Sequence, residues 1–485
     1  MTIQTETWWT DRRTRVLGIA AVILVFGFVE LLWIQAFPLG HLHTGDTDNL
    51  VAGARTALDC VDQGTWRGCA HVPGNPGTGV FPYPLLQYLP ATFAVWLGAS
   101  DTAVLGFLAR ISVLAFAGCL GLIWFALRER PRLAALGVLA VLGSAATYQA
   151  TSAFGEMLAA LVVVAAIVAV RSGRPATILA TCLVACIAKE TLAPFVVLLG
   201  LVAGRPDDRW LPRRRVLVPL VIGAGFGVFL NIGFNLFRFG SPRNLNYLQS
   251  FRRTPGIGLK LELFVAEWAS PVAGLLWTWS IASGLIIVVL GIGLVRLVRN
   301  PRNPVDWLPS LAASGVAVAF TAILATWFAP FGWSAYGHRL AVPILPAVVL
   351  VCLLACPIQI DEFLHHIGRR TSSVVVAIPL LLVVAWPQTA APWTWRDSLS
   401  EMRAENPECN QPVMIETMAD LYFECLTDVT WPEDLSVRRA AFPDGSVPLS
   451  ARAASLTAVL GLALVVIWPE RRPVVSPETV AAVDK

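Results

Sequence analysis

The sequence predicts an all-α integral membrane protein with about twelve transmembrane helices. Of its 485 residues, 56% are hydrophobic and only 14% are charged, whereas about 25% are charged in a typical soluble protein. Several apolar runs reach about 20 residues, the length that a helix needs to cross the hydrocarbon core of a bilayer. Many of the 18 tryptophans lie near the ends of these runs, as is typical of the aromatic belts at membrane surfaces.

The distribution of arginine predicts the orientation of the chain. The first span, 16–37, follows three arginines, so residues 1–15 are expected to form a cytoplasmic tail. This span ends in Phe37-Pro38 and is too long for a signal peptide with a small-residue cleavage site. If every later arginine-rich break is cytoplasmic, the number of spans between successive breaks must be even. These breaks lie at 128–132, 171–174, 205–215, 296–302 and 369–370.

We predict one transmembrane domain over 16–468 and a cytoplasmic tail over 469–485. This arrangement gives an even number of spans between successive breaks. After the first span, the predicted spans are 101–127, 133–148, 155–170, 175–188, 191–203, 216–237, 271–296, 307–327, 341–357, 373–387 and 453–468. The predicted extracytoplasmic loops are 38–100, 238–270, 328–340 and 388–452.

Two apolar segments leave alternatives open. Residues 83–98 are apolar enough to enter the bilayer, but a full crossing would break the even count, so we expect a re-entrant or interfacial segment. Residues 175–203 could form one long helix. The arginines on both sides favour two helices that turn at Lys189-Glu190.

The nine cysteines divide into two groups. Five lie inside apolar spans, where a thiol behaves as a small hydrophobic group. The other four are Cys60 and Cys69 in the first outer loop and Cys409 and Cys425 in the last. An oxidising compartment favours disulfides there. Bonds within each loop are the simplest of three pairings, which sequence alone does not decide; zinc and free thiols are the alternatives, and these spacings are not those of zinc fingers.

Two carboxylates, Asp46 and Asp48, follow the first span. One of them could cap the helix that residues 49–58 predict, since aspartate satisfies free N–H groups at a helix start. A cap does not require two carboxylates with two nearby histidines, His41 and His43. The functional interpretation is a general base for an acceptor hydroxyl, or ligands of a divalent metal. No cofactor or metal ligand set is assigned.

Further charged residues stand at predicted outer ends of spans. Glu156 begins a span, where an acid is costly unless it has a function or interacts with the helix dipole. Lys189 and Glu190 lie between two apolar helices and either neutralise each other or hold a phosphate. Arg339 follows His338 at the mouth of a span. Arginine suits bidentate phosphate recognition, and an interface anchor is the alternative.

These residues, in this order and on one side, resemble the GT-C superfamily of polytopic glycosyltransferases that use polyprenyl-phosphate-linked sugars. The resemblance covers most of the chain and rests on short motifs. They are Gly45-Asp46-Thr47-Asp48, Phe81-Pro82-Tyr83-Pro84, Glu156, Lys189-Glu190-Thr191, the segment from Asn235 through Arg238 to Pro242 that leads to Tyr247, and Tyr336-Gly337-His338-Arg339. The chain departs from many relatives in having His338 rather than proline before the arginine, and in having a short last outer loop.

The resemblance implies inverting transfer of a hexose or pentose from a polyprenyl-phosphate donor to an envelope glycan, lipid or protein, on the extracytoplasmic face of the plasma membrane. Asp46, or Asp48 in its place, would deprotonate the acceptor hydroxyl. Arg339, His338 and Lys189 would neutralise the departing phosphate. An apolar groove beside residues 83–98 would hold the prenyl tail.

Two other classes of function compete with this interpretation. A transporter or lipid flippase would show repeated halves or paired broken helices, and neither is apparent in the sequence. A non-catalytic scaffold would not need carboxylates and outward arginines on one face. The formal net charge of +4 comes from short loops without a basic stripe, which argues against a nucleic-acid partner.

Overall fold

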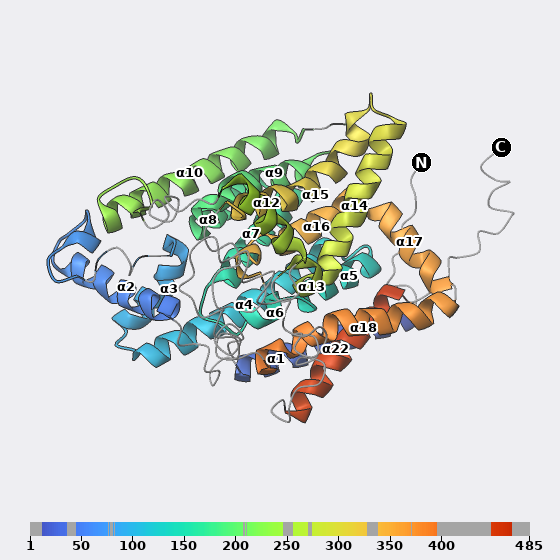
Figure 1. The fold of residues 1–485 in the computed structure, drawn as a ribbon, viewed down its shortest axis with the longest axis horizontal. Helices are drawn as coiled ribbons and strands as arrows, with labels where there is room; N and C mark the ends of the chain where they lie inside the picture. Colours follow the sequence, from blue (N-terminus) through green and yellow to red (C-terminus); the bar gives the residue numbers. More distant parts are fainter. Residues whose placement is uncertain are drawn as a thin grey trace.

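The computed structural model describes most of the chain as a bundle of helices (Figure 1). The described residues are 12–35, 45–75, 77, 81, 83–206, 209, 211–245, 256–269, 274–326, 338–369, 371–394 and 448–467. Within these ranges the regular elements are all helices, without a β-strand. The predicted all-α class is therefore confirmed.

Each predicted span coincides with a helix. They are α1 (Arg12–Gln35), α4 (Asp101–Ala126), α5 (Pro131–Leu142), α7 (Glu156–Ser172), α8 (Pro175–Ala188), α9 (Ala193–Gly204), α10 (Arg214–Phe239), α14 (Ser280–Arg299), α15 (Pro304–Leu324), α16 (Leu345–Ala355), α18 (Thr371–Thr394) and α22 (Leu449–Ile467). Among the described residues, seven helices are long and apolar enough to cross a membrane, or eight if one bent pair counts as a span. The chain is a multi-pass membrane protein, while the number twelve stays a prediction because α5, α8 and α9 are short.

The predicted span 341–357 is shorter and more bent than expected. It begins with a 3-10 turn, η6 (Arg339–Ala341), continues as α16, and turns by 86° at Cys356 into α17 (Pro357–Arg369). The first residue of α17 is a proline, which lacks the N–H that would continue the preceding helix. Buried Ile360 and Leu364 on α17 alternate with exposed Ile358 and Phe363. An amphipathic helix of this kind fits a membrane surface.

The first outer loop carries two further helices, as predicted. They are α2 (Gly45–Asp62) and α3 (Leu85–Trp96), and they lie together at one end of the molecule (Figure 1). A helix of 12 residues is only about 18 Å long and cannot cross a bilayer core of about 30 Å. Leu89, Phe93 and Trp96 are exposed along α3 while Tyr88 and Ala91 are buried, which is the pattern of an interfacial helix.

The break predicted at Lys189-Glu190 is present. Helix α8 ends at Ala188, a 3-10 turn η5 (Glu190–Leu192) follows, and α9 begins at Ala193. Pro194 at the start of α9 is at a position where its missing N–H costs nothing. Residues 175–203 are thus two helices rather than one.

Helices α8 and α10 pack closely because two glycines face the contact. A Cβ atom at Gly223 would lie 2.5 Å from the carbonyl oxygen of Leu179, and one at Gly227 would lie 2.5 Å from Cβ of Cys186. Small residues four positions apart allow helix backbones to approach in membranes. One turn further along α10, the side-chain amide of Asn231 donates to the carbonyl of Cys186 at 2.6 Å. Helix α10 therefore holds the last turn of α8, next to Lys189.

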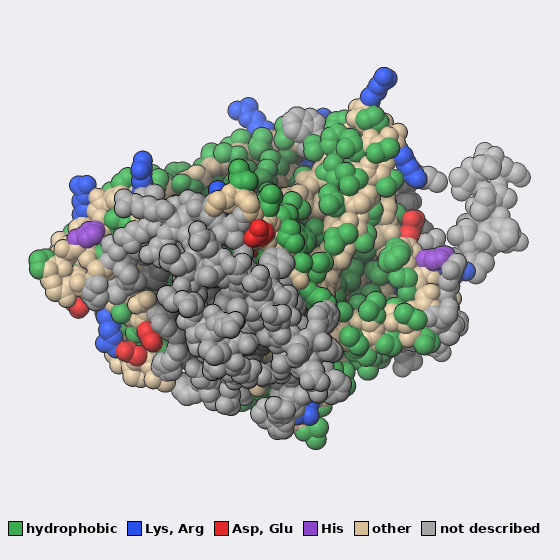
Figure 2. Space-filling view, in the orientation of Figure 1, with side chains coloured by type: hydrophobic (Ala, Val, Ile, Leu, Met, Phe, Trp, Pro, Cys, Tyr) green, Lys and Arg blue, Asp and Glu red, His purple; other side chains and the backbone are tan. Residues whose placement is uncertain are grey.

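Arginines at three of the predicted cytoplasmic breaks contact neighbouring segments of the chain. Arg205 donates to the carbonyl of Val305, Arg296 donates to that of Asp306, and Arg132 lies 3.3 Å from a ring nitrogen of His365. Space-filling Figure 2 shows hydrophobic side chains over much of the visible described surface, with Lys and Arg near its edges.

The predicted disulfide of the first outer loop joins Cys60 and Cys69. It fixes the end of α2 to a 3-10 turn, η3 (Cys69–His71), which rests on the end of α10. There the N–H of Gly68 donates to the carbonyl of Leu236 at 3.1 Å, and its φ of 70° favours glycine. The candidate pair Cys409 and Cys425 lies outside the described residues.

Candidate active site

Arg339 and Glu156 form a buried ion pair between two segments far apart in the sequence. Nε of Arg339 donates to Oε1 of Glu156 at 2.9 Å, and the two side chains are only 8% and 5% exposed. The guanidinium also stands 3.9 Å from the ring centroid of Phe154, a cation–π arrangement. Burial of two charges is costly unless they are paired, so this pair fixes η6 against the start of α7.

The start of α7 depends on Gly155. Its φ is 76°, and a Cβ atom there would lie 2.8 Å from the side chain of Gln87 on α3. Any other residue would have a strained backbone and would have to displace the side chain of Gln87. The carboxylate of Glu156 thus leaves the first turn of α7 beside the interfacial helix.

Lys189 adds a positive charge to this ion pair. It lies in extended backbone between α8 and η5, and the three groups Lys189, Glu156 and Arg339 interact electrostatically. Removal from water lowers the pKa of Lys189 to about 8, against the opposing effect of Glu156 and together with that of Arg339. Since the charges of Glu156 and Arg339 cancel, the three groups together carry a net positive charge below that pH. This charge favours the binding of an anion.

His338 pairs with an acid that the sequence analysis did not select. Its Nε2 lies 3.4 Å from Oε2 of Glu267, on helix α12 (Ile257–Ala269), and both side chains are 0% exposed. Burial lowers the pKa of His338 to about 3 and raises the pKa of Glu267 well above its usual range. Burial therefore favours the neutral form of both side chains. The predicted role of His338 in neutralising a phosphate stays a prediction.

Glu267 could have been found from helical spacing. Leu263 and Ala266 are buried on α12, and Glu267 follows them at the spacing that places all three on one face. Its neighbour Glu262 is exposed, as is normal for an acid on a helix. An acid in register with an apolar face is the signal that was missed.

Arg238, a candidate site residue in the sequence, contacts backbone carbonyls and aromatic rings in the structure. It is fully buried. Its guanidinium donates to the carbonyls of Phe81 and Tyr83 and to Oδ1 of Asn235, and it lies against the rings of Phe234 and Phe239. The outward position of this arginine is thus explained by the backbone that it holds.

Tyr83 is buried beside that anchor. Its N–H lies 3.5 Å from the hydroxyl of Tyr88, and the two rings meet edge to face at 6.3 Å. Burial raises the pKa of Tyr88 above its usual range. The Pro-rich aromatic segment is held from α3 on one side and from α10 on the other.

The two candidate aspartates, Asp46 and Asp48, fall in the first turn of α2, which begins at Gly45. Asp48 is exposed and Thr47 is buried. Their helix approaches the start of α7, because Leu50, Gln87 and Gly155 line one small cavity. The structure therefore brings the first turn of α2, the interfacial helix α3 and the segment of Glu156 to one place.

Some candidates lie outside what the structure describes. They are the side chains of Asp46 and Glu190, all of Tyr247, and the aromatic segment 331–337 before His338. Their predicted roles stay predictions.

Chemically, the described site combines an arginine, a lysine and two acids in a largely dry environment next to a helix start that carries two aspartates. Cations with little competing water bind phosphate oxygens strongly. A carboxylate within reach can accept a proton from a hydroxyl. The arrangement suits a reaction in which a phosphate departs and an alcohol attacks.

Comparisons with known proteins found two similar crystal structures. No protein-family model matches the chain, and no curated protein matches it. Two crystal structures of ArnT from Cupriavidus metallidurans are similar over 92% of this chain and 77% of theirs. The apo structure has a TM-score of 0.46 and 15% identity, and the one bound to undecaprenyl phosphate has 0.43 and 14%. Similarity at this level does not bear on what the present chain does.

Proposed function

We propose that the chain is a membrane glycosyltransferase of the GT-C type. It transfers a sugar from a polyprenyl-phosphate donor to an envelope acceptor on the extracytoplasmic side. The observation that carries the proposal is the buried ion pair of Arg339 and Glu156 with the half-buried Lys189 beside it. Three segments that are distant in the sequence supply it, beside the helix that begins with Asp46 and Asp48.

In the proposed reaction the acceptor oxygen forms a bond to the anomeric carbon of the sugar, and the bond from that carbon to the phosphate oxygen breaks. The bond's electron pair leaves with the polyprenyl phosphate. The proton of the acceptor hydroxyl passes to Asp46, or to Asp48 in its place. Attack from the face opposite the phosphate inverts the configuration at the anomeric carbon.

Arg339 and Lys189 would stabilise the negative charge that develops on the departing phosphate. Glu156 holds the guanidinium in place through Nε. Removal of one such charge stabiliser costs about 10²- to 10³-fold in rate in enzymes of this general kind. Arg339→Lys keeps the charge but loses the planar geometry.

The test is sugar transfer by purified protein from a panel of polyprenyl-phosphate sugars, with release of polyprenyl phosphate as the readout. We expect Arg339→Ala to lose at least about 100-fold in rate, and Asp46→Asn to lose transfer while folding normally. Asp59→Asn, an exposed acid on the same helix α2, is the matched control and should act like the wild type.

Two outcomes would contradict the assignment. Full activity in both Asp46→Asn and Asp48→Asn would show that neither aspartate is the base. Unchanged donor binding in Arg339→Ala would show that the phosphate lies elsewhere. Movement of an intact lipid-linked sugar across the membrane, without release of polyprenyl phosphate, would favour the transporter alternative.

A further inference from the structure

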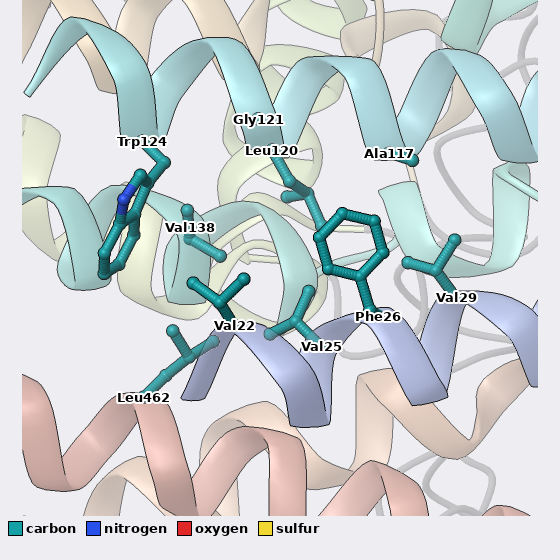
Figure 3. A pocket seen from close by; sticks show the side chains of 10 residues that line it. All are labelled: Val22, Val25, Phe26, Val29, Ala117, Leu120, Gly121, Trp124, Val138 and Leu462. Carbon is teal, nitrogen blue, oxygen red and sulfur yellow. The ribbon is translucent and has the colours of Figure 1, made fainter. Parts of the chain in front are cut away.

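A second site lies on the membrane-facing side of the bundle, formed by helices other than those that carry the candidate active site. Helices α1, α4, α5 and α22 enclose a cavity of about 210 Å³ (Figure 3). Its walls are apolar: Phe26 and Val29 come from α1, Leu120 and Trp124 from α4, and Leu462 from α22. Phe26 is 68% exposed, so the cavity opens on the surface of the bundle.

Charged residues stand beyond one end of this cavity. Arg110 precedes the lining residue Ala117 by seven residues on α4, which is two turns along the same face. Its guanidinium lies 5.6 Å from the ring centroid of Trp33 on α1. Glu30 is exposed, and it follows Phe26 by four residues, one turn along the same face.

This end is the predicted extracytoplasmic one, because α1 approaches its last residue, Gln35, there. Tryptophan is favoured at the headgroup level of a membrane. An exposed acid within an apolar helix is costly in lipid unless an opposite charge meets it. A lipid headgroup with both a phosphate and an amine would meet Arg110 and Glu30 together.

We propose that the cavity holds an acyl chain of a phospholipid from the surrounding bilayer. The phosphate lies at Arg110 and the headgroup amine at Glu30. The site selects phosphatidylethanolamine over phosphatidylglycerol, since only the former carries an amine. The apolar walls account for the chain, and the two charges account for the headgroup.

A single glycine offers a way to close the cavity without crowding the protein. Gly121 lines it, and a Cβ atom at Gly121 would meet nothing within 4 Å. Gly225 on α10 is also exposed, and a Cβ atom there would also meet nothing within 4 Å. Gly121→Leu and Gly225→Leu therefore form a matched pair, in which only the first fills the cavity.

The experiment is native mass spectrometry of the delipidated protein titrated separately with dioleoyl phosphatidylethanolamine, dioleoyl phosphatidylglycerol or undecaprenyl phosphate. We expect one tightly held phosphatidylethanolamine in the wild type and in Gly225→Leu. Gly121→Leu should weaken it at least tenfold, with Gly121→Ala between them. Arg110→Gln should weaken both lipids, whereas Glu30→Gln should abolish only the preference for phosphatidylethanolamine.

Two results would overturn the proposal. Equal lipid retention in Gly121→Leu and Gly225→Leu would show that the cavity does not hold the chain. Undisturbed phosphatidylethanolamine binding in Gly121→Leu with loss of undecaprenyl phosphate binding would assign the cavity to a polyprenyl chain instead. Thermal unfolding of each variant identifies losses of lipid binding that come from misfolding. If Gly121→Leu misfolds, Gly121→Ala provides the decisive comparison.

Discussion

Burial affects the charge of individual residues at the candidate site in different ways. Arg339 keeps its charge because Glu156 contacts it at 2.9 Å and because guanidinium groups do not lose their proton in proteins. His338 and Glu267 are equally buried, yet burial favours the neutral form of each. Lys189 lies between these cases, since its pKa of about 8 is near the physiological range.

The lowered pKa of Lys189 predicts how donor use depends on pH. The ammonium form, which attracts phosphate, is present below about pH 8 and is lost as pH rises through that value. We therefore expect KM for the donor to increase above about pH 8. Lys189→Arg should remove this increase because arginine keeps its charge. Initial rates from pH 6 to 9 at several donor concentrations measure it.

A flat KM profile in the wild type across this range would contradict the role of Lys189 in donor binding. Lys260, an ionisable lysine on α12 outside the described ion-pair group, offers the control. Lys260→Arg should leave the profile of the wild type unchanged.

At the scale of elements, the first outer loop is held by contacts that polar side chains and glycines make with α10. Arg238 donates to two backbone carbonyls of the segment before α3. Gly68 and Gly240 lie next to each other, and both have a positive φ that favours glycine. The disulfide between Cys60 and Cys69 closes the same unit.

Loss of the Arg238 anchor should destabilise the protein. Arg238→Ala leaves the carbonyls of Phe81 and Tyr83 and the amide oxygen of Asn235 buried without this donor. Each such loss costs about 1–3 kcal/mol, so we expect the free energy of unfolding to fall by about 3 kcal/mol or more. Thermal or denaturant unfolding in detergent measures the change.

Arg67 provides a control at the same contact. It is exposed and makes one bond of 3.3 Å to the carbonyl of Gly240. Exposed contacts of this kind contribute little, so Arg67→Ala should change the free energy of unfolding by less than about 0.5 kcal/mol. Similar losses in both variants would argue against a specific anchoring role for Arg238.

At the scale of the whole molecule, two ends are distinguished by their residues. Arginines at three of the predicted breaks contact neighbouring segments, and the candidate site joins the starts and ends of α2, α7, α8 and η6. The two ends must face opposite sides of a membrane if the helices between them cross it. The positive-inside tendency predicts that the arginine-rich end is cytoplasmic.

Labelling of single cysteines can test this orientation. Gln63 and Arg174 are both exposed, the first after α2 and the second between α7 and α8. In intact cells, a membrane-impermeant maleimide should label Gln63→Cys at once and Arg174→Cys only after permeabilisation. The reverse order would place the candidate site in the cytoplasm and would rule out a donor presented on the outer face.

By itself the sequence was sufficient for the class of the protein and the positions of its apolar helices. It favoured a break at Lys189-Glu190 and a disulfide within the first outer loop, and the structure decided both. Apolar length, arginine position and cysteine location are local properties, so the sequence displays them directly. It also selected Glu156, Lys189 and Arg339, because an ionisable group at the end of an apolar span is rare.

Only the tertiary structure decided which of these groups meet. Arg339 pairs with Glu156 and His338 lies beside Glu267, although these partners are 183 and 71 positions apart. Arg238 anchors the backbone from a fully buried position. The charge of a buried group depends on its neighbours in space and on loss of water. Neither can be read from the sequence. Only the fold therefore shows which of the candidate residues are charged, which are neutral and which have a structural role.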